Sequence, residues 1–190
     1  MQSSLSQLMS ESGSKVNFPK ETTLFHEGDL CQGMLIVTKG SIKVIKYSDD
    51  GKEALLYRVN PDNLCILSVS CLIGNNLYNA EGIAEDDIEG VFISHPKFLS
   101  LLNTHSDFRE YIFKNFAHRI SDFIQKLDDI IFKSVKERLA DFIAQKGEVN
   151  MTHQELAVEL GTSREVVSRL LKSLENEGLV DLSRGHIKKI

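Results

Sequence analysis

The 190-residue sequence predicts an α+β protein, with a small antiparallel β-barrel or sandwich first, a long helix next and a winged helix-turn-helix last. Short apolar runs separated by turn residues fill residues 18–97, which is typical of a small β domain. A heptad pattern of apolar residues follows in residues 98–133, and helix-start motifs with a Gly-containing turn occur in residues 134–190. Residues 1–17 are expected to form a flexible N-terminal segment.

The composition is that of an ordinary globular protein, with 42% hydrophobic and 26% charged residues. No apolar run reaches the roughly 18 residues that a membrane helix needs, and "MQSSLSQLMSESGS" lacks the basic start and apolar core of a signal peptide. We therefore expect a cytoplasmic protein with no membrane partner. The net charge is -5, yet residues 134–190 carry nine basic and nine acidic residues. Binding to a polyanion must depend on where individual cations lie.

A β-hairpin is predicted in the N-terminal half. "SIKVIKY" alternates apolar and polar residues, Asp50-Gly51 marks a turn, and "EALLYRV" resumes the pattern until Asn60-Pro61-Asp62. Asp-Gly between alternating segments is a strong hairpin signal, because both residues tolerate positive φ. Several short strands joined by regular turns are expected here.

A long helix with an apolar seam is predicted between Phe98 and Lys133. Five of its apolar residues are spaced alternately four and three apart, the heptad spacing of a coiled coil: Phe116, Ile120, Phe123, Leu127 and Ile130. The alternative is a helix packed on its own barrel, which needs a wider stripe that includes Phe113, Ile124 and Ile131. Both sets are present, so we expect the helix to pack on the barrel and to form a homodimer through the seam.

A domain boundary is predicted at about Phe132 to Ser134. "SVKE" is a capping-box pattern, in which Ser134 and Glu137 satisfy each other's backbone donors at a helix start. A new helix directly after a long one marks a hinge. Residues 134–190 are therefore expected to form a separate domain.

Two helices joined by a tight turn are predicted within "THQELAVELGTSREVVSRLLKSLENEGLV". The first begins at the capping box "THQE", with Thr152 as cap, and runs to about Leu160. Gly161 makes the turn, and the capping box "TSRE", with Thr162 as cap, begins a helix that runs to about Asn176. This is a helix-turn-helix, whose second helix enters the major groove of DNA.

The second helix carries polar and charged side chains on one face and apolar side chains on the other. Four polar residues are predicted to read base edges: Arg164, Glu165, Ser168 and Arg169. Five apolar residues are predicted to face the core: Val166, Val167, Leu170, Leu171 and Leu174. Arginine presents two donors to guanine O6 and N7, and glutamate accepts from cytosine N4. Alternatively, Glu165 is only the capping partner of Thr162 and the arginines are solvated charges, but the complete pattern favours DNA reading.

A short β-hairpin is predicted in "GLVDLSRGHIKKI", with Gly185 in its turn. Such a hairpin is the wing of a winged helix. Its cations Arg184, Lys188 and Lys189 are expected to meet phosphates, which position a protein without specifying sequence. Double-stranded DNA is the predicted partner.

The order of barrel, long helix, hinge and winged helix-turn-helix resembles the Crp/Fnr family of bacterial transcription regulators over nearly the whole chain. The most specific match is "THQELAVELGTSREVVSRLLKSLENEGLV", and "LFHEGD" and "SVKERLADFI" match more loosely. The resemblance implies a jelly-roll barrel of the cyclic-nucleotide-binding type, a homodimer, and RNA polymerase as a further partner.

The resemblance also implies roles for individual residues. Those matching Arg164, Glu165 and Arg169 read a TGTGA-like half-site in the family. Contacts with the DNA backbone are expected from Thr152, Thr162 and Ser163. A dimer would present two recognition helices related by a two-fold axis. This symmetry implies a palindromic operator, with half-sites about one helical turn, roughly 34 Å, apart.

The sensor region departs from the family. Relatives that bind cyclic nucleotides carry a cassette of the form "GELALL...RSA", whose Glu holds the ribose and whose Arg and Ser hold the phosphate. Here "LSVSCLIGNNLYNA" places Ser68 at the Glu and Tyr78-Asn79 at the Arg-Ser. A buried phosphate without an Arg partner is poorly compensated, so cyclic AMP or cyclic GMP is not expected to bind in the usual mode. Nor does any cysteine precede Cys31 to build the iron–sulfur cluster of oxygen-sensing relatives.

Several effectors stay open. Cys31, Cys65 and Cys71 are candidate sensors in a redox or persulfide switch, or they are simply small buried hydrophobes. An extended "CILSVSC" would hold its two thiols about 20 Å apart, whereas a partly helical one brings them closer. Haem or a small apolar ligand is another candidate, with His26, His95 or His105 as axial ligands. Two further alternatives are an unidentified small molecule as effector and a regulator that has no effector.

Catalysis is not expected. A small barrel can be a cupin enzyme, which needs several His and Glu side chains facing its interior. Residue 26 is the only histidine before residue 90, so the strand region offers the pair His26-Glu27 and no second histidine near it. We therefore expect no metal site and no enzyme, and the sequence assigns no cofactor.

Overall fold

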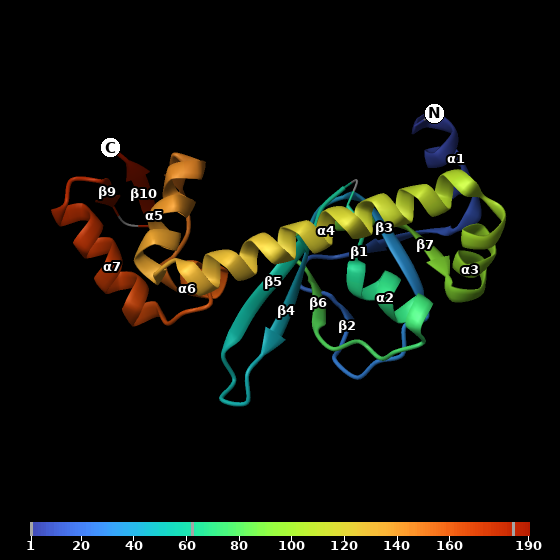
Figure 1. The fold of residues 1–190 in the computed structure, drawn as a ribbon, viewed down its shortest axis with the longest axis horizontal. Helices are drawn as coiled ribbons and strands as arrows, with labels where there is room; N and C mark the ends of the chain where they lie inside the picture. Colours follow the sequence, from blue (N-terminus) through green and yellow to red (C-terminus); the bar gives the residue numbers. More distant parts are fainter. Residues whose placement is uncertain (1, 62, 184) are drawn as a thin grey trace. The chain divides into compact units, whose positions relative to one another are not determined.

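The computed structural model describes residues 2–61, 63–183 and 185–190. The chain forms two compact units, one of Met1–Lys46 with Leu56–Asp122 and one of Tyr47–Leu55 with Phe123–Ile190. Seven helices lie in the described residues (Figure 1): α1 Gln2–Ser12, α2 Ile66–Gly74, α3 His95–Thr104, α4 Ser106–Phe132, α5 Val135–Lys146, α6 His153–Leu160 and α7 Arg164–Asn176. Within the described chain, no helix combines the length and apolar character needed to cross a membrane.

The strands form three sheets. One has the order β1-β7-β3, with β1 Ser14–Phe18, β7 Ile88–Ser94 and β3 Gly33–Lys39. The second has the order β2-β6-β4-β5, with β2 Thr23–Phe25, β6 Glu81–Ala84, β4 Ile42–Tyr47 and β5 Glu53–Val59. The third, in the C-terminal part, has the order β8-β10-β9, with β8 Glu148–Val149, β10 His186–Lys189 and β9 Val180–Ser183. The predicted α+β class is confirmed, and the two N-terminal sheets are compatible with a jelly-roll whose sheets stay open.

The hairpin predicted from its alternating residues is present as β4 and β5. Gly51 adopts a positive φ of 79°. Its amide donates to the Ser48 carbonyl at 2.8 Å, and the Ser48 amide donates to the Lys52 carbonyl at 2.9 Å. The turn falls at the Asp-Gly pair because a tight hairpin turn requires a residue with positive φ, which glycine adopts without strain.

The N-terminal segment differs from the expected flexible chain. β1 pairs antiparallel with β7, from Ser14 opposite Phe92 to Phe18 opposite Ile88. Met9 of α1 is 8% exposed and belongs to the core cluster. By pairing with β1, the backbone N–H and C=O groups along one edge of β7 form hydrogen bonds that they would otherwise lack. The paired residues lie at least 70 positions apart in the sequence, and a pattern read from neighbouring residues misses the pairing.

The helical region predicted after Pro96 is divided into two helices. α3 begins at His95, three residues before the predicted start at Phe98, and places Pro96 in its first turn, where a missing N–H costs no hydrogen bond. His105 ends α3 with extended dihedrals, φ −120° and ψ 108°. Phe98 and Phe108, on either side of this break, are both fully buried. The break lets both helices turn an aromatic side chain into one core.

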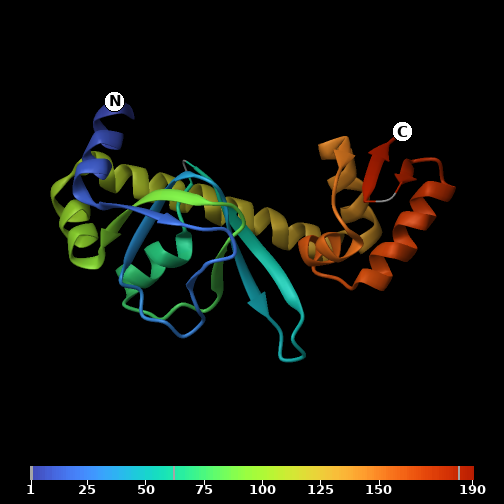
Figure 2. The same ribbon diagram turned by 180° about the vertical axis from the view of Figure 1, so that it is seen from behind.

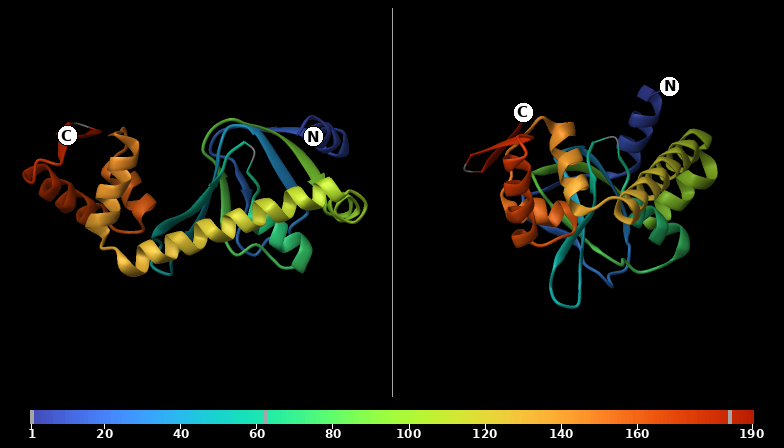
Figure 3. Two further views of the ribbon diagram at one scale, coloured as in Figure 1. Left: turned by 45° about the horizontal axis from the view of Figure 1, so that its top comes forward. Right: turned by 60° about the vertical axis from the view of Figure 1, so that its left-hand side comes forward.

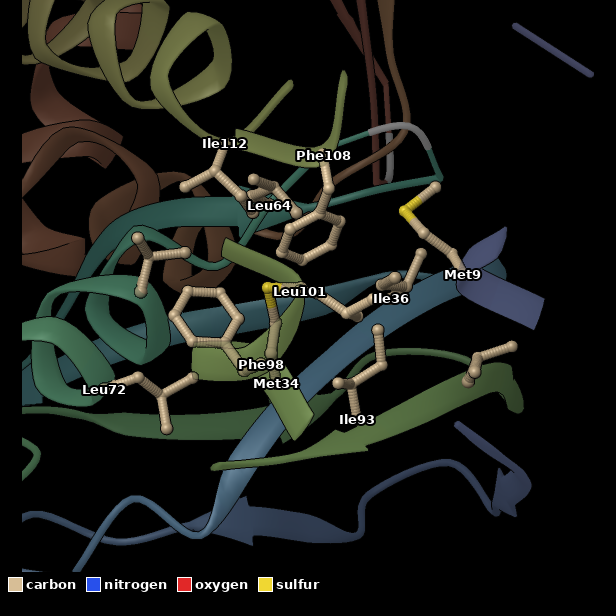
Figure 4. Packing of buried hydrophobic residues seen from close by; sticks show 12 residues of the cluster. Met9, Met34, Ile36, Leu64, Leu72, Ile93, Phe98, Leu101, Phe108 and Ile112 are labelled. Carbon is tan, nitrogen blue, oxygen red and sulfur yellow. The ribbon is translucent and has the colours of Figure 1, made fainter. Parts of the chain in front are cut away.

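That core joins both helices to the β1-β7-β3 sheet. The rings of Phe98 and Phe108 meet edge to face, with centroids 5.9 Å apart and planes at 75°. Figure 4 shows them pointing towards one another beside Leu101 and Met34. The cluster comprises Met9, Met34, Ile36, Leu64, Val69, Leu72, Val91, Ile93, Phe98, Leu101, Phe108 and Ile112.

The helix start predicted at Ser134 is confirmed. The Ser134 amide donates to Glu137 Oε2 at 2.8 Å, and the Glu137 amide donates to Ser134 Oγ at 3.3 Å. α5 then runs from Val135 to Lys146 and packs in a second core. That core comprises Leu139, Ile143, Val149, Leu156, Ala157, Leu160, Val167, Leu171, Leu174, Val180 and Ile187.

Removing this cap should weaken the C-terminal part. Ser134→Ala deletes the hydroxyl that accepts from the Glu137 amide, and loss of an N-cap costs about 1 kcal/mol. Urea unfolding monitored by circular dichroism should show that decrease. Ser121→Ala, on the exposed side of α4, is the control and should change the unfolding free energy by less than about 0.5 kcal/mol. Equal stability of the two variants would contradict the role of the cap.

Candidate nucleic-acid interface and effector region

α6 and α7 form the predicted helix-turn-helix. The capping box at Thr152 is present, since its amide donates to Glu155 Oε2 at 2.7 Å. Gly161 ends α6 in the left-handed conformation, with φ 63° and ψ 46°. A residue with a Cβ is strained in this conformation, so glycine suits the turn. Figure 3 shows α6 and α7 as neighbouring helices.

The cap of α7 lies one residue later than predicted. Ser163, not Thr162, is the cap, and its Oγ accepts from the Val166 amide at 3.4 Å. The Thr162 amide instead donates to the Ala157 carbonyl at 2.9 Å and so still belongs to the end of α6. The predicted capping box of Thr162 with Glu165 was therefore wrong.

Glu165 is held ionised at the start of α7. Its own backbone amide and the Ser163 side chain donate to the carboxylate, and they lower its pKa below the ordinary value. The residue is exposed. An ionised, exposed carboxylate is the acceptor that cytosine N4 requires.

The two faces of α7 separate as predicted. Val167, Leu171 and Leu174 are at most 1% exposed, and Val166 and Leu170 are half-buried beside them. On the other face Arg164, Glu165 and Arg169 are exposed, and Ser168 is half-buried. Arg169 forms no ion pair with any residue that the structure describes. Its guanidinium can therefore meet DNA without breaking an internal salt bridge.

A contact between α6 and α7 was missed from the sequence. His153 Nδ1 lies 2.7 Å from Ser168 Oγ. Ser168 Oγ also donates to the Arg164 carbonyl at 2.9 Å. No local motif joins two residues fifteen positions apart, so only the packing of the two helices reveals this bridge.

The predicted wing is present as β9 and β10. The strands pair antiparallel, with His186 opposite Ser183, and Gly185 in the turn has a φ of 72°. Figure 2 shows the hairpin beside α7. Lys188 is exposed and lies 3.5 Å from Glu148, whereas Arg184 falls outside the described residues. β8 adds a third strand that the sequence did not predict.

α4 keeps an apolar face exposed. Of the predicted seam, Phe116 packs partly against the core and Phe123 is half-buried. Seven large apolar residues of the helix stay more than 40% exposed: Phe113, Ile120, Ile124, Leu127, Ile130, Ile131 and Phe132. An exposed apolar stripe of this length marks an interaction surface.

The segment "CILSVSC" is helical rather than extended, because α2 begins directly after Cys65 and includes Cys71. Ser68 lies in α2 and is only 4% exposed. The Tyr78 hydroxyl lies 2.8 Å from Ser68 Oγ and 3.0 Å from Cys31 Sγ. The two residues that replace the cassette Glu and Arg are therefore bonded to each other.

The Tyr78 ring is fixed by an aromatic stack. It lies on Phe25 with centroids 4.0 Å apart and planes at 13°. Phe25 in turn covers Gly82, where any Cβ would lie 2.2 Å from the Phe25 ring. A side chain at this glycine would displace Phe25 and with it the support of Tyr78.

A second tyrosine bonds the start of α2. The Tyr57 hydroxyl accepts from the Leu67 amide at 3.3 Å and lies 3.6 Å from Cys65 Sγ. The guanidinium of Arg119, from α4, lies 5.7 Å from the Tyr57 ring centroid and donates to the Arg58 carbonyl at 3.0 Å. Burial raises the pKa of Tyr57, so its hydroxyl stays neutral.

The three cysteines are free thiols. Burial raises the pKa of the Cys31 thiol. The pKa of Cys71 is raised to about 11, mainly by burial and to a smaller extent by the neighbouring thiols of Cys31 and Cys65. Cys71 Sγ donates to the Leu77 carbonyl at 3.4 Å. Because the thiolate is the reactive form, this environment keeps Cys71 unreactive near neutral pH.

The three candidate haem ligands are not brought together. His95 Nε2 bonds to the Leu72 carbonyl at 3.0 Å, and His105 Nδ1 bonds to Thr104 Oγ1 at 2.8 Å. His26 Nδ1 is exposed and lies 3.6 Å from Glu81. Among the described residues, no group of three His, Cys, Asp or Glu side chains is arranged to hold a metal ion.

Comparison with known proteins gives matches over both parts of the chain. Residues 15–105 match the cyclic nucleotide-binding domain, and residues 119–190 match the Crp-like helix-turn-helix domain. The cAMP-activated global transcriptional regulator Vfr of Pseudomonas aeruginosa is 27% identical over 185 residues, which covers 86% of this chain and 83% of Vfr.

Two solved structures are similar over the whole chain. A transcriptional regulator of the crp/fnr family from Eubacterium rectale is 30% identical, with a TM-score of 0.81, and the match covers 100% of this chain and 90% of that one. The c-di-GMP-responsive global regulator CLP of Xanthomonas campestris shares the fold, with a TM-score of 0.87, 20% identity and coverage of 100% and 99%. With a helix-turn-helix that exposes two arginines and a glutamate, the chain belongs to the Crp/Fnr family of DNA-binding transcription regulators.

Proposed function

We propose that this regulator binds as a homodimer to a palindromic operator with TGTGA-like half-sites. Arg164, Glu165 and Arg169 read the bases. The exposure of these three side chains on one face of α7 carries the proposal. Thr152, Ser163 and Lys188 would meet phosphates from the helix starts and the wing, where backbone N–H groups and cations favour anions.

The exposed apolar face of α4 supports the dimer. Side chains at the heptad positions Ile120, Leu127 and Ile130 are 44%, 56% and 59% exposed in the single chain. A second copy of the helix would bury them in a left-handed coiled coil. A regulator of this kind would act in the cytoplasm, with RNA polymerase as a further partner, and we propose no catalytic role for it.

Selection from a pool of random DNA duplexes tests the operator. The purified protein should enrich an inverted repeat, with half-site centres separated by about one helical turn, roughly 34 Å. The salt dependence of binding to the enriched duplex should separate phosphate contacts from base contacts. Enrichment of no repeat, or of single half-sites only, would count against the proposal.

We infer that cyclic AMP and cyclic GMP are not the effectors. In the structure Ser68 and Tyr78 bond to each other, and Phe25 stacks on the tyrosine ring. Neither residue supplies the positive charge that would compensate a buried cyclic phosphate. Operator affinity measured with and without each cyclic nucleotide should be unchanged, and a cyclic nucleotide that tightened binding would contradict the inference.

A thiol signal is the second candidate for the effector, because all three cysteines are free thiols and Cys65 lies close enough to Cys31 and to Cys71 to help raise the pKa of each. The raised pKa of Cys71 makes a direct prediction. Alkylation of Cys71 by iodoacetamide in the folded protein should be slow at pH 7 and rise about tenfold per pH unit until about pH 11, because the thiolate fraction rises in that way. Mass spectrometry of the labelled peptide measures this rate.

Rapid labelling of Cys71 at neutral pH would show a reactive thiolate instead. The oxidant dependence of operator binding, compared between the parent and Cys31→Ser, then tests the thiol signal itself. Indifference of the parent to oxidants and reductants would remove this candidate.

A further inference from the structure

The bridge between α6 and α7 assigns a proton to one nitrogen of His153. Ser168 has a single hydroxyl proton, and the Arg164 carbonyl, 2.9 Å away, can only accept. The hydroxyl therefore donates to that carbonyl. His153 Nδ1, 2.7 Å from the same oxygen, must then be the donor.

The same bonds restrict what Ser168 can do. Its only proton is directed at the first residue of α7, and one of its acceptor sites is filled by His153. Donation to a DNA base would require breaking the bond to the Arg164 carbonyl. Ser168 lies immediately before Arg169 and four residues after Arg164, so its bonds fix the backbone that carries both arginines.

We propose that His153 and Ser168 are positioning residues that hold the first turns of α7 for DNA reading, and that Ser168 does not itself read a base. This inference rests on the proposed DNA-reading function. His153 is the first residue of α6 and Ser168 is in the middle of α7, so the bridge joins the two helices of the motif directly. Both side chains are half-buried, and the bond is thus partly shielded from competing water.

The proton assignment is tested in the free protein. Two-dimensional 15N–1H spectra of the histidine rings should show the proton of neutral His153 on Nδ1. Ser168→Ala should return it to Nε2, because the hydroxyl that favours the Nδ1–H form is gone. A proton on Nε2 in the parent would overturn the proposal without involving DNA.

A double-mutant cycle tests the functional part. His153→Ala and Ser168→Ala should each weaken binding to the selected operator about fivefold, the worth of one hydrogen bond, and leave binding to random duplex unchanged. The double variant should lose about the same fivefold, since both changes remove one interaction. Losses that multiply would show that the two residues act separately and would overturn the proposal. Thermal unfolding of each variant and of Gln145→Ala, an exposed control on α5, monitors folding.

Two further variants keep the outcome decisive if an alanine variant fails to fold. His153→Asn places an amide N–H near the position of Nδ1 and should restore operator affinity to within about twofold, whereas His153→Gln places it near Nε2 and should not. The operator selected by Ser168→Ala should match that of the parent. Relaxed preference at one base pair would instead make Ser168 a base reader and overturn the proposal. If the parent itself prefers no sequence, the proposed function fails while the assignment of the proton stands.

Discussion

Arg169→Ala should weaken operator binding by about 1 to 3 kcal/mol and relax the preference at one guanine in each half-site. The guanidinium is exposed on the reading face and has no ion pair within the described chain, so its charge is available to DNA. The variant should fold normally, because the core face of α7 is carried by Val167, Leu171 and Leu174. Fluorescence anisotropy with the selected operator and with single-base variants of it measures both effects.

Lys172→Ala supplies the matched control. Lys172 is an exposed cation on the same helix, but it is paired with Glu175 at 2.6 Å. Its removal should change affinity by less than about 0.5 kcal/mol and leave the base preference intact. If the two variants weaken every duplex equally, Arg169 contributes only charge, and the assignment of base reading to this face fails.

Leu127→Asp should separate the dimer. Leu127 is 56% exposed in the single chain, so the aspartate leaves the fold of the chain unchanged. In a coiled coil it would remove two buried leucines, about 3 to 6 kcal/mol per dimer, and place two negative charges opposite each other. Light scattering should report half the parent mass. Operator affinity should also fall, because in a monomer the binding of one recognition helix no longer raises the effective concentration of a second one at the other half-site.

Gln125→Asp introduces the same charge on α4 at a position outside the heptad pattern. Its mass and operator affinity should match those of the parent. An unchanged mass for Leu127→Asp would assign the exposed apolar face to some other partner. A reduced mass for both variants would point to a general charge effect on the helix.

The predictions that succeeded depend on residues close together in the sequence. The capping boxes at Ser134 and Thr152 and the Asp50-Gly51 turn each need only four or five consecutive residues. The separation of α7 into an exposed polar face and a buried apolar face follows from helical periodicity alone. Local chemistry of this kind is largely independent of the rest of the fold.

The features that were predicted wrongly, or not predicted at all, depend on contacts with distant residues or with the end of another element. Thr162 has the composition of a cap, but the Ala157 carbonyl already holds its amide. Pairing of β1 with β7 and the bridge from His153 to Ser168 join segments that no sequence period connects. The stack of Phe25 on Tyr78 likewise required the folded chain, although the replacement of the cassette residues was visible in the sequence.

The Tyr78 stack has a consequence for engineering. Tyr78 is 7% exposed and is bonded to a thiol and a hydroxyl. Placing an arginine there by one substitution would bury an uncompensated charge and cost about 3 to 5 kcal/mol. A chain taking that step would depend on a bound anion to stay folded.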